Sequence, residues 1–355
     1  MSTPLKEQLL SQIAADGPIT MSDYMAQCLM HPKYGYYQQE RIFGVDGDFI
    51  TAPEVSQMFG EMVGLWLADR WIKMGKPNPV HLIEFGPGRG TLMADMLRAI
   101  SPVEGFEDAA KVHFIETSLQ LRELQKDRVP NAKWHDSMET LPAGPSLIIA
   151  NEFFDALPIH QFEKHADGWL ERRINAEEES FTLVLTPPSA KFALCSPDLH
   201  DNPVGSVMEV CPGGITIAGD IARRISEHSG AALIIDYGHK KSAIGDTFQA
   251  LKNHAYADPL AEPGKADITA HVDFDKLATA AAEQGAVVVG PAAQGLFLMA
   301  LGIGARAQQL SEALDTVGQQ RILSELKRLT AGEGMGTLFK VLAIQSSDLP
   351  EAPGF

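Results

Sequence analysis

The sequence LIEFGPGRGTL, residues 82–92, decides the fold that we expect for this chain. An apolar run leads into three glycines within five positions, at Gly86, Gly88 and Gly90, and a helical pattern follows. Glycine at the end of a strand lets backbone amides approach a ligand that a Cβ atom would keep away. The N-terminus of the following helix adds a partial positive charge at the same place. The stretch therefore predicts a strand, a ligand-holding turn and a helix.

The residues around this turn alternate between expected strands and expected helices. Apolar runs predict strands at residues 80–85, 111–117, 132–136, 146–154, 231–238, 286–290 and 337–345. Apolar residues spaced three and four apart predict helices at residues 91–100, 118–128 and 214–230. Such alternation is typical of a parallel sheet covered by helices. We therefore expect an α/β protein with a Rossmann-like sheet of seven strands, the last of them antiparallel.

The chain also has segments that interrupt this alternation. Three helical patterns, at residues 6–17, 22–32 and 56–75, precede the first strand, and residues 159–174 look like an antiparallel hairpin around an Ala-Asp-Gly turn. The expected domain organisation is as follows: residues 1–75 form a helical extension with an active-site loop, 76–158 and 204–350 the core, 159–203 a hairpin insertion or cap, and 240–270 an irregular insertion.

Composition excludes several classes of protein. The net charge is −17, from 29 basic and 46 acidic residues, which argues against a nucleic-acid partner. No apolar run reaches the roughly 20 residues that span a membrane. The first residues resemble neither a signal peptide nor a transit peptide, so we expect a bacterial cytoplasmic protein. Cys28, Cys195 and Cys211 form no C-x-x-C pair and predict buried thiols, with neither a metal site nor a disulfide.

The glycine turn distinguishes between three ligands. A dinucleotide-binding G-x-G-x-x-G motif would need glycine at position 91, where Thr91 stands. A P-loop would need a lysine after the last glycine, and the sequence GRGT has none. An acid two residues before the first glycine, Glu84, suits a ligand that carries an ammonium group. The G-x-G-x-G spacing with that acid is typical of methyltransferases that bind S-adenosylmethionine.

Polar residues at the ends of neighbouring strands agree with this ligand. Glu84 and the glycines would hold the methionine part, Glu116 the two ribose hydroxyls and Asp136 the adenine amino group. The fourth strand ends in Asn151 and Glu152, at the carboxyl edge where open parallel sheets bind ligands.

Simpler structural explanations stay open for several of these residues. The glycines could form only a tight turn, Glu116 could cap the next helix, and Asp136 could be a solvated turn residue. His113 and His135 lack metal-ligand spacing, which favours core or surface histidines.

Three longer motifs resemble the MidA family. They are GDFITAPEVSQMFGE (47–61), EFGPGRGTL (84–92) and NEFFDALPIHQF (151–162), and DITAHVDF (267–274) is similar as well. This family contains the mitochondrial protein-arginine methyltransferase that assists assembly of respiratory complex I. The resemblance implies a class I methyltransferase fold, S-adenosylmethionine as the methyl donor, and dimethylation of an arginine on the complex I subunit that lines the quinone cavity.

If the methyl acceptor is an arginine, we expect acidic residues near the methyl donor. The guanidinium has a pKa above about 12, so a carboxylate must bind it and draw its charge away from the attacking nitrogen. The candidate acids are Glu54, Glu152 and Asp155, with Asp48 as a further pocket residue. Glu54 could instead be a helix-start acid and Asp155 a cap or turn acid.

Further residues complete the predicted site. The expected pocket walls are Tyr36, Phe153, Phe154 and His271, and a core position is the alternative for His271. Thr51, Leu92 and Asn151 join the expected cofactor-binding set. The paired-glutamate hairpin and the Thr-His-Trp loop of better-known protein-arginine methyltransferases are absent from the sequence, so arginine specificity rests on the MidA resemblance. Two other functions stay open: a non-catalytic assembly chaperone that binds S-adenosylmethionine, and a methyltransferase with a small-molecule acceptor. The sequence predicts no oligomeric state.

Overall fold

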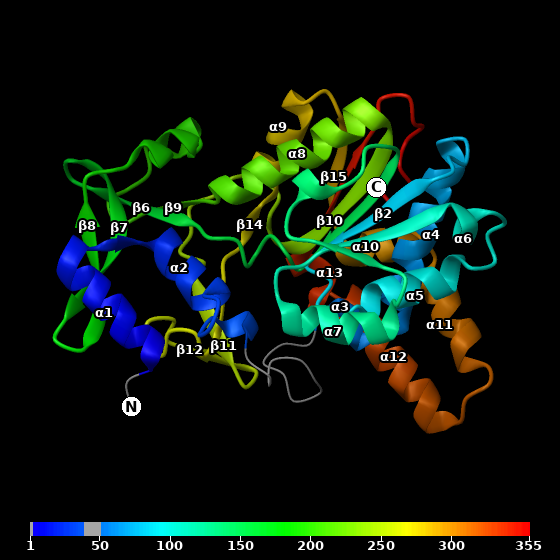
Figure 1. The fold of residues 1–355 in the computed structure, drawn as a ribbon, viewed down its shortest axis with the longest axis horizontal. Helices are drawn as coiled ribbons and strands as arrows, with labels where there is room; N and C mark the ends of the chain where they lie inside the picture. Colours follow the sequence, from blue (N-terminus) through cyan, green and yellow to red (C-terminus); the bar gives the residue numbers. More distant parts are fainter. Residues whose placement is uncertain (1–2, 39–50) are drawn as a thin grey trace. The chain divides into compact units, whose positions relative to one another are not determined.

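A computed structural model describes residues 3–38 and 51–355 of the chain (Figure 1). The chain divides into two compact units. We call Ile50–Phe153, Ile217–Lys240 and Leu277–Phe355 the core unit, and Met1–Phe49, Phe154–Thr216 and Lys241–Lys276 the insertion unit. The domain limits expected from the sequence stay a prediction.

The core unit is built on the predicted seven-stranded sheet. Its strands are β2 (Val80–Phe85), β3 (Ala110–Ile115), β4 (Lys133–His135), β5 (Ser146–Asn151), β10 (Gly230–His239), β15 (Val287–Ala293) and β16 (Phe339–Gln345). They lie in the order β15-β16-β10-β5-β2-β3-β4. The pairs from β10 to β4 are parallel, whereas β16 runs antiparallel to both β10 and β15. The expected α/β fold with an antiparallel last strand is confirmed.

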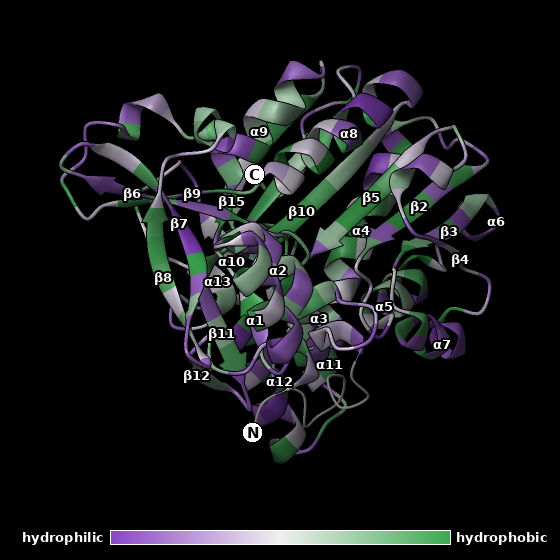
Figure 2. Cartoon of the chain, turned by 60° about the vertical axis from the view of Figure 1, so that its left-hand side comes forward, coloured by the Kyte–Doolittle hydropathy of each residue, from purple (hydrophilic) through white to green (hydrophobic). Residues whose placement is uncertain are grey.

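Apolar side chains explain why these strands form the centre of the unit. Every residue of β2 and β5 is buried, and β10 is buried up to its last residue, which is half-buried. Strands buried on both faces read as continuous apolar runs, as Figure 2 shows for β10 and β5. Polar residues at the ends of such strands are therefore conspicuous.

Helices cover this sheet. The helices that lie wholly in the core unit are α3 (Ala52–Val55), α4 (Gln57–Lys73), α5 (Thr91–Ile100), α6 (Phe106–Ala109), α7 (Leu119–Arg128), α10 (Gln294–Ala300), α11 (Ile303–Ser311), α12 (Thr316–Thr330), α13 (Met335–Leu338) and the 3-10 turn η2 (Met138–Thr140). Two more, α8 (Pro212–His228) and α9 (Phe274–Glu283), begin in the insertion unit and end in the core unit. The helices expected at residues 56–75, 91–100, 118–128 and 214–230 are confirmed.

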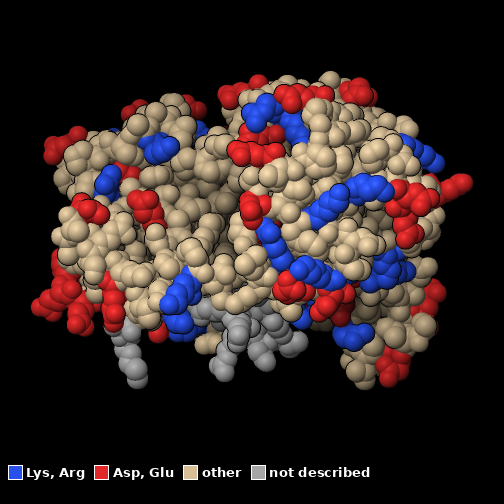
Figure 3. Space-filling view, in the orientation of Figure 1, with Lys and Arg blue, Asp and Glu red and all other residues tan. Residues whose placement is uncertain are grey.

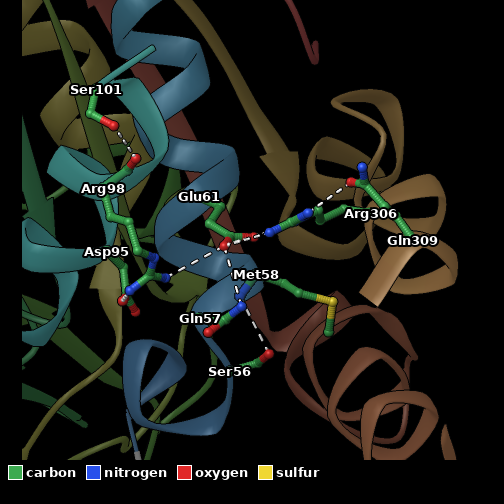
Figure 4. A network of polar contacts seen from close by, with 9 residues as sticks. All are labelled: Ser56, Gln57, Met58, Glu61, Asp95, Arg98, Ser101, Arg306 and Gln309. Atoms are coloured by element: carbon green, nitrogen blue, oxygen red, sulfur yellow. Dashed lines mark hydrogen bonds and ion pairs between the residues drawn. The ribbon is translucent and has the colours of Figure 1, made fainter. Parts of the chain in front are cut away.

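A buried carboxylate ties three of these helices together (Figure 4). Glu61 on α4 is 5% exposed and accepts hydrogen bonds from Arg306 on α11 and Arg98 on α5. The helices α4 and α5 also pack closely, because a Cβ atom at Gly60 would come within 2.6 Å of the Cβ atom of Asp95. Helix α5 begins at the glycine turn, and these contacts fix its position against α4.

The insertion unit contains the predicted hairpin within a larger sheet. Its elements are α1 (Pro4–Asp16), β1 (Ile19–Thr20), α2 (Met21–Met30), η1 (Tyr36–Gln38), β6 (His160–His165), β7 (Gly168–Glu177), β8 (Ser180–Thr186), η3 (Ala190–Leu194), η4 (Pro197–Leu199), β9 (Val207–Val210), β11 (Gln249–Lys252), β12 (Ala255–Ala257), β13 (Asp267–Thr269) and β14 (Val272–Asp273). The hairpin of β6 and β7 is confirmed, with His165 opposite Gly168, and β1, β8 and β9 extend it to five strands.

The stretch 240–270 differs from the irregular segment that the sequence predicted. Strands β11, β12 and β13 form a small antiparallel sheet within it. The β11–β12 turn places Asn253 and His254 at positive φ. Each strand has only three or four residues, which is too short for alternation to stand out from a loop.

Other expectations from composition can be checked on the described residues. Within residues 3–38 and 51–355, no helix has the length and apolar character needed to cross a bilayer. The same residues include no cluster of three or more histidine, cysteine or acidic side chains suited to a metal ion. The cysteines are unpaired thiols, two of them buried and Cys211 half-buried. In Figure 3, lysine and arginine side chains are interspersed with acidic ones. The exposed Glu177, Glu178 and Glu179 lie at the β7–β8 turn.

Candidate cofactor site

The glycine turn has the backbone shape that its sequence predicts. Gly86, Gly88 and Gly90 have φ values of +56°, +51° and +78°, which are strained for residues with a Cβ atom. A Cβ atom at Gly86 would lie 2.9 Å from the ring of Phe153, whereas a Cβ atom at Gly88 would meet nothing within 4 Å. Gly90 is the N-cap of α5 and offers no side-chain cap. The turn thus leaves open space beside Gly88 and presents the first amides of α5.

Glu84 is a buried carboxyl group at the end of β2 with an unpaired oxygen. The residue is 2% exposed, and its Oε2 atom has no hydrogen-bond partner among the described residues. Burial raises the pKa of this carboxyl group to about 8. A buried carboxyl group without a partner is costly, so it requires an explanation. The ammonium group of a methionine moiety would supply the missing donors, and the residues present therefore fit S-adenosylmethionine.

Asn151 and Glu152 end strand β5. The Oδ1 atom of Asn151 is buried and has no hydrogen-bond partner within residues 3–38 and 51–355, and its Nδ2 atom donates to Glu152 Oε1 at 3.1 Å. Glu152 has a φ of +49°, which is uncommon for a residue other than glycine. Its Oε1 atom also accepts a hydrogen bond from the backbone N of Ala52 at 2.8 Å. Backbone strain of this kind tends to cluster at functional sites.

Glu116 follows β3 and is held on both of its carboxylate oxygens. Its Oε1 atom accepts from the backbone N of Ser118 at 2.8 Å, and its Oε2 atom accepts from Gln125 Nε2 at 3.2 Å. The residue is 8% exposed, and burial raises its pKa while these two donors lower it. The contact with Ser118, the N-cap of α7, fits the alternative that Glu116 supports a helix start. The ribose role of Glu116 stays a prediction.

Asp136 follows β4 and is largely exposed. Its side chain is 81% exposed and forms an ion pair with Arg122, which also donates to the backbone oxygen of Glu116. Sequence reasoning did not identify Arg122, although it lies on the predicted helix four residues after Ser118. The adenine role of Asp136 also stays a prediction.

The segment that contains Thr51 and Glu54 is attached to the glycine turn. Thr51 is the N-cap of α3, and Glu54 Oε1 accepts from the hydroxyl group of Thr91 at 2.6 Å. Arg89 lies 3.8 Å from the other oxygen of Glu54. Thr91 is the first residue of α5, and the next residue, Leu92, is buried. These contacts make Glu54 a link between α3 and the turn.

The remaining predicted pocket residues lie in the insertion unit. Tyr36, Phe154 and Asp155 are buried, and His271 is half-buried. The backbone oxygen of Asp155 accepts from Ala270 N at 3.0 Å, and the backbone N of His271 donates to Thr247 Oγ1 at 2.8 Å. Desolvation raises the pKa of Tyr37, and the carboxyl groups of Asp267 and Asp155 raise it further. Asp48 lies outside the described residues.

Three histidines form a hydrogen-bonded chain across β2, β3 and β4. The Nδ1 atom of His81 lies 3.0 Å from His113 Nε2, and His113 Nδ1 lies 2.9 Å from His135 Nε2. The oxygen of Ala143 can only accept from His81 Nε2, so neutral rings with hydrogen on Nε2 satisfy the whole chain. Burial lowers all three pKa values, that of His113 to about 4. Such a chain agrees with the expectation of core and surface histidines.

Comparison with known proteins identifies the family. A family model described as "Putative S-adenosyl-L-methionine-dependent methyltransferase" matches residues 62–292. The chain is 38% identical to the Drosophila melanogaster protein arginine methyltransferase NDUFAF7 homolog, mitochondrial, over 96% of this chain and 84% of that protein. It is 35% identical to the Homo sapiens protein arginine methyltransferase NDUFAF7, mitochondrial, over 96% of this chain and 83% of that protein.

A solved structure supports the same assignment. A COG1565 superfamily member from Burkholderia thailandensis, solved with bound S-adenosyl-homocysteine, is 28% identical to this chain. The two structures superpose with a TM-score of 0.84 over 99% of this chain and 93% of that one.

Proposed function

The chain belongs to the MidA family of S-adenosylmethionine-dependent methyltransferases, and we propose that its methyl acceptor is an arginine side chain of a protein. The observation that supports the methyl donor is the buried Oε2 atom of Glu84 beside the glycine turn, which has no partner in the part of the chain that the structure describes. Similarity over 96% of the chain to relatives named protein arginine methyltransferases supports the acceptor half. The proposed acceptor protein is a subunit of respiratory complex I, on the side of the quinone cavity, as the family resemblance implies.

Each polar part of the donor has a matching group in the core unit. In this proposal Glu84 binds the ammonium group, and the first amides of α5 bind the carboxylate of the methionine part. Glu116 accepts hydrogen bonds from the ribose hydroxyls, and Asp136 accepts one from the adenine amino group. Thr51 and Leu92 flank the same ligand from α3 and α5.

Glu152 is the acid that we propose to bind the acceptor guanidinium. S-adenosylmethionine supplies a methyl group on a sulfonium, so the protein mainly has to bind and orient the reactants and exclude water. The carboxylate of Glu152 concentrates the guanidinium charge away from the attacking nitrogen and accepts the proton that this nitrogen loses. Its φ of +49° and its hydrogen bonds to Ala52 and Asn151 hold it in one orientation.

The other candidate acids have different surroundings. Glu54 is bound by Thr91, so in this proposal it acts on the reaction by positioning α3 against the turn. Asp155 remains a candidate for the acceptor side, together with Tyr36, Phe153, Phe154 and His271. A respiratory acceptor is compatible with the cytoplasmic location that the sequence predicts, which itself stays a prediction because the curated relatives are named mitochondrial.

Mass spectrometry of the acceptor tests the proposal. The purified complex I subunit that lines the quinone cavity is incubated with this protein and S-adenosylmethionine, and its arginine peptides are searched for one or two added methyl groups. We expect the modification with the wild type and at least a 100-fold slower reaction with Glu152→Gln, which should keep its affinity for S-adenosylhomocysteine. Glu123→Gln, the same change at an exposed position of α7, is the matched control.

Two other outcomes contradict separate halves of the proposal. Binding of S-adenosylhomocysteine without any modified arginine would contradict the acceptor and favour an assembly chaperone or a small-molecule acceptor. Absence of binding would contradict the donor site.

A further inference from the structure

A single buried amide joins the two predicted halves of the cofactor site. Gln125 lies on α7 and is fully buried. Its Nε2 atom donates to the backbone oxygen of Gly88 at 2.8 Å and to Glu116 Oε2 at 3.2 Å. Its Oε1 atom accepts from the indole Nε1 of Trp134 on β4 at 2.7 Å. The glycine turn, the end of β3 and strand β4 thus meet at one side chain.

The partners of Gln125 determine the orientation of its amide. The indole N–H of Trp134 can only donate, whereas the oxygens of Gly88 and Glu116 can only accept when Glu116 is ionised. Only one of the two amide orientations satisfies all three partners, and in it both amide hydrogens point toward the cofactor-binding residues. Both hydrogens of the amide nitrogen are therefore used in these two hydrogen bonds.

The same contacts orient the carboxylate of Glu116. Ser118 N and Gln125 Nε2 each occupy one oxygen of Glu116. The backbone N–H of Thr117 is a third donor to this carboxylate. A carboxylate has about four acceptor positions, so capacity remains for a ribose hydroxyl. Gly90 also faces Gln125, because a Cβ atom there would lie 3.6 Å from the Cα atom of Gln125. The distance between the turn and the ribose acid is therefore set through α7.

We propose that Gln125 is a positioning residue for S-adenosylmethionine, which holds Glu116 at a fixed distance from the carbonyl of Gly88 so that one rigid edge binds the methionine part and the ribose together. This inference rests on the proposed function, because it takes Glu116 as the ribose ligand. Gln125 itself does not contact the cofactor in this proposal. The near-isosteric change Gln125→Glu removes both donors and places a second carboxyl group against Glu116.

Calorimetric titration with S-adenosylhomocysteine tests the inference. At pH 8 we expect Gln125→Glu to raise the dissociation constant roughly 30-fold. At pH 6 we expect a loss of less than about fivefold, since a proton shared by the two carboxyl groups restores one hydrogen bond. Gln294→Glu is the matched control, because Gln294 is also fully buried and donates to the oxygen of Leu329 on α12. It should lower the melting temperature and leave the affinity within about twofold.

A double variant separates positioning from simple loss of packing. In Glu116→Gln combined with Gln125→Glu, the amide and the carboxylate exchange places and can again share a hydrogen bond. We therefore expect this protein to bind no worse than Glu116→Gln alone. Should Gln125→Glu fail to fold, Gln125→Met keeps the volume without the donors and should lose about tenfold in affinity at pH 6 and at pH 8 alike.

The possible failures are distinguishable. The role of Gln125 would be overturned if Gln125→Glu bound S-adenosylhomocysteine with an affinity within twofold of the wild type. If only Gln125→Met folds, the same result with that variant would overturn it. Either result would leave the proposed function intact. An equal loss for Gln125→Glu at both pH values, additive with Glu116→Gln, would also overturn the role of Gln125. No binding by the wild type would overturn the proposed function itself.

Discussion

Two adjacent strands, β2 and β3, end at buried carboxyl groups that differ in their hydrogen-bond partners. Glu84, the penultimate residue of β2, is 2% exposed and has an oxygen without a partner among the described residues, whereas Glu116, after β3, is 8% exposed and has a donor on each oxygen. Burial raises the pKa of both, but only at Glu116 do neighbouring donors oppose that shift. The protein therefore has one acid oriented in advance and another whose partner must come from a ligand.

This difference shows how stability and binding compete in one site. Removing an unsatisfied buried group tends to stabilise a protein, whereas removing one member of a satisfied pair leaves its partner unpaired. A residue kept at a cost in stability is a sign of function. The two acids should thus respond to the same substitution with opposite changes in stability.

The largest effect is expected for Glu84→Gln, which removes the charge and keeps the shape. Affinity for S-adenosylhomocysteine should fall at least 100-fold because the buried ammonium group loses its counter-charge. The free protein should become more stable, by about 2 to 3 kcal/mol at pH 7, because the pKa of the carboxyl group rises from 4.5 to about 8 on folding. Calorimetric titration and thermal unfolding measure the two effects.

Glu61→Gln is the matched control for this change. Glu61 is also buried, but it is paired with Arg306 and Arg98. We expect a loss of about 2 kcal/mol in stability, since two guanidinium groups lose their shared counter-charge, and an affinity within about threefold of the wild type. A Glu84→Gln protein that loses stability to the same extent would show that Glu84 has a partner in the folded protein.

The second effect is a pH dependence of binding. In the free protein the Glu84 carboxyl group is mostly protonated below its pKa of about 8, and the bound ammonium group requires it ionised. Affinity for S-adenosylhomocysteine should therefore rise with pH, by up to about 50-fold between pH 6 and pH 8. Titrations at pH 7 in two buffers of different ionisation enthalpy should show nearly one proton released. The pH dependence of affinity that remains in Glu84→Gln would measure the contribution of Glu116.

The third effect is smaller and concerns Glu116→Gln. One amide hydrogen of the new side chain must face either Gln125 Nε2 or Ser118 N, both of which are donors, so stability should fall by about 1 to 2 kcal/mol. Loss of the ribose acceptor should weaken binding of S-adenosylhomocysteine about tenfold. Thermal unfolding beside Glu84→Gln is the direct comparison, and a gain in stability here would contradict the satisfied state of Glu116.

Only part of the difference between Glu84 and Glu116 could be predicted from the sequence. The position of Glu84 follows from local pattern, because an apolar run, an acid and three glycines lie within one stretch. The same holds for β2, β5, β10 and β16 of the core unit, whose apolar runs are long enough to be distinctive. Short strands were missed, since the two residues of β1 join the sheet of the insertion unit only by pairing with Arg173 and Ile174 on β7.

The partners of Glu116 could not be predicted because they depend on tertiary packing. Gln125 looks like any polar residue of an exposed helix, and only the orientation of α7 turns it toward Gly88 and Trp134. One signal was available: Leu121 and Gln125 are spaced four apart on that helix, and both are buried. The exposure of Asp136 also depends on where the short strand β4 ends.

The smallest effect involves His113, which links β3 to β2 and β4 and opposes Glu84 in its pH dependence. The pKa of His113 is about 4 in the folded protein against 6.5 unfolded, so the unfolded chain binds more protons between these values. Stability from this residue is complete above about pH 6.5 and is lost as the pH falls, by about 1 kcal/mol at pH 5.5. Glu84 acts in the opposite sense, because the folded state binds the extra proton between pH 4.5 and about 8. Unfolding by urea at pH 5.5 and pH 7.5 should therefore show that acidification changes stability more favourably in His113→Asn than in the wild type, and less favourably in Glu84→Gln. Equal changes in the three proteins would mean that neither group changes its protonation on folding.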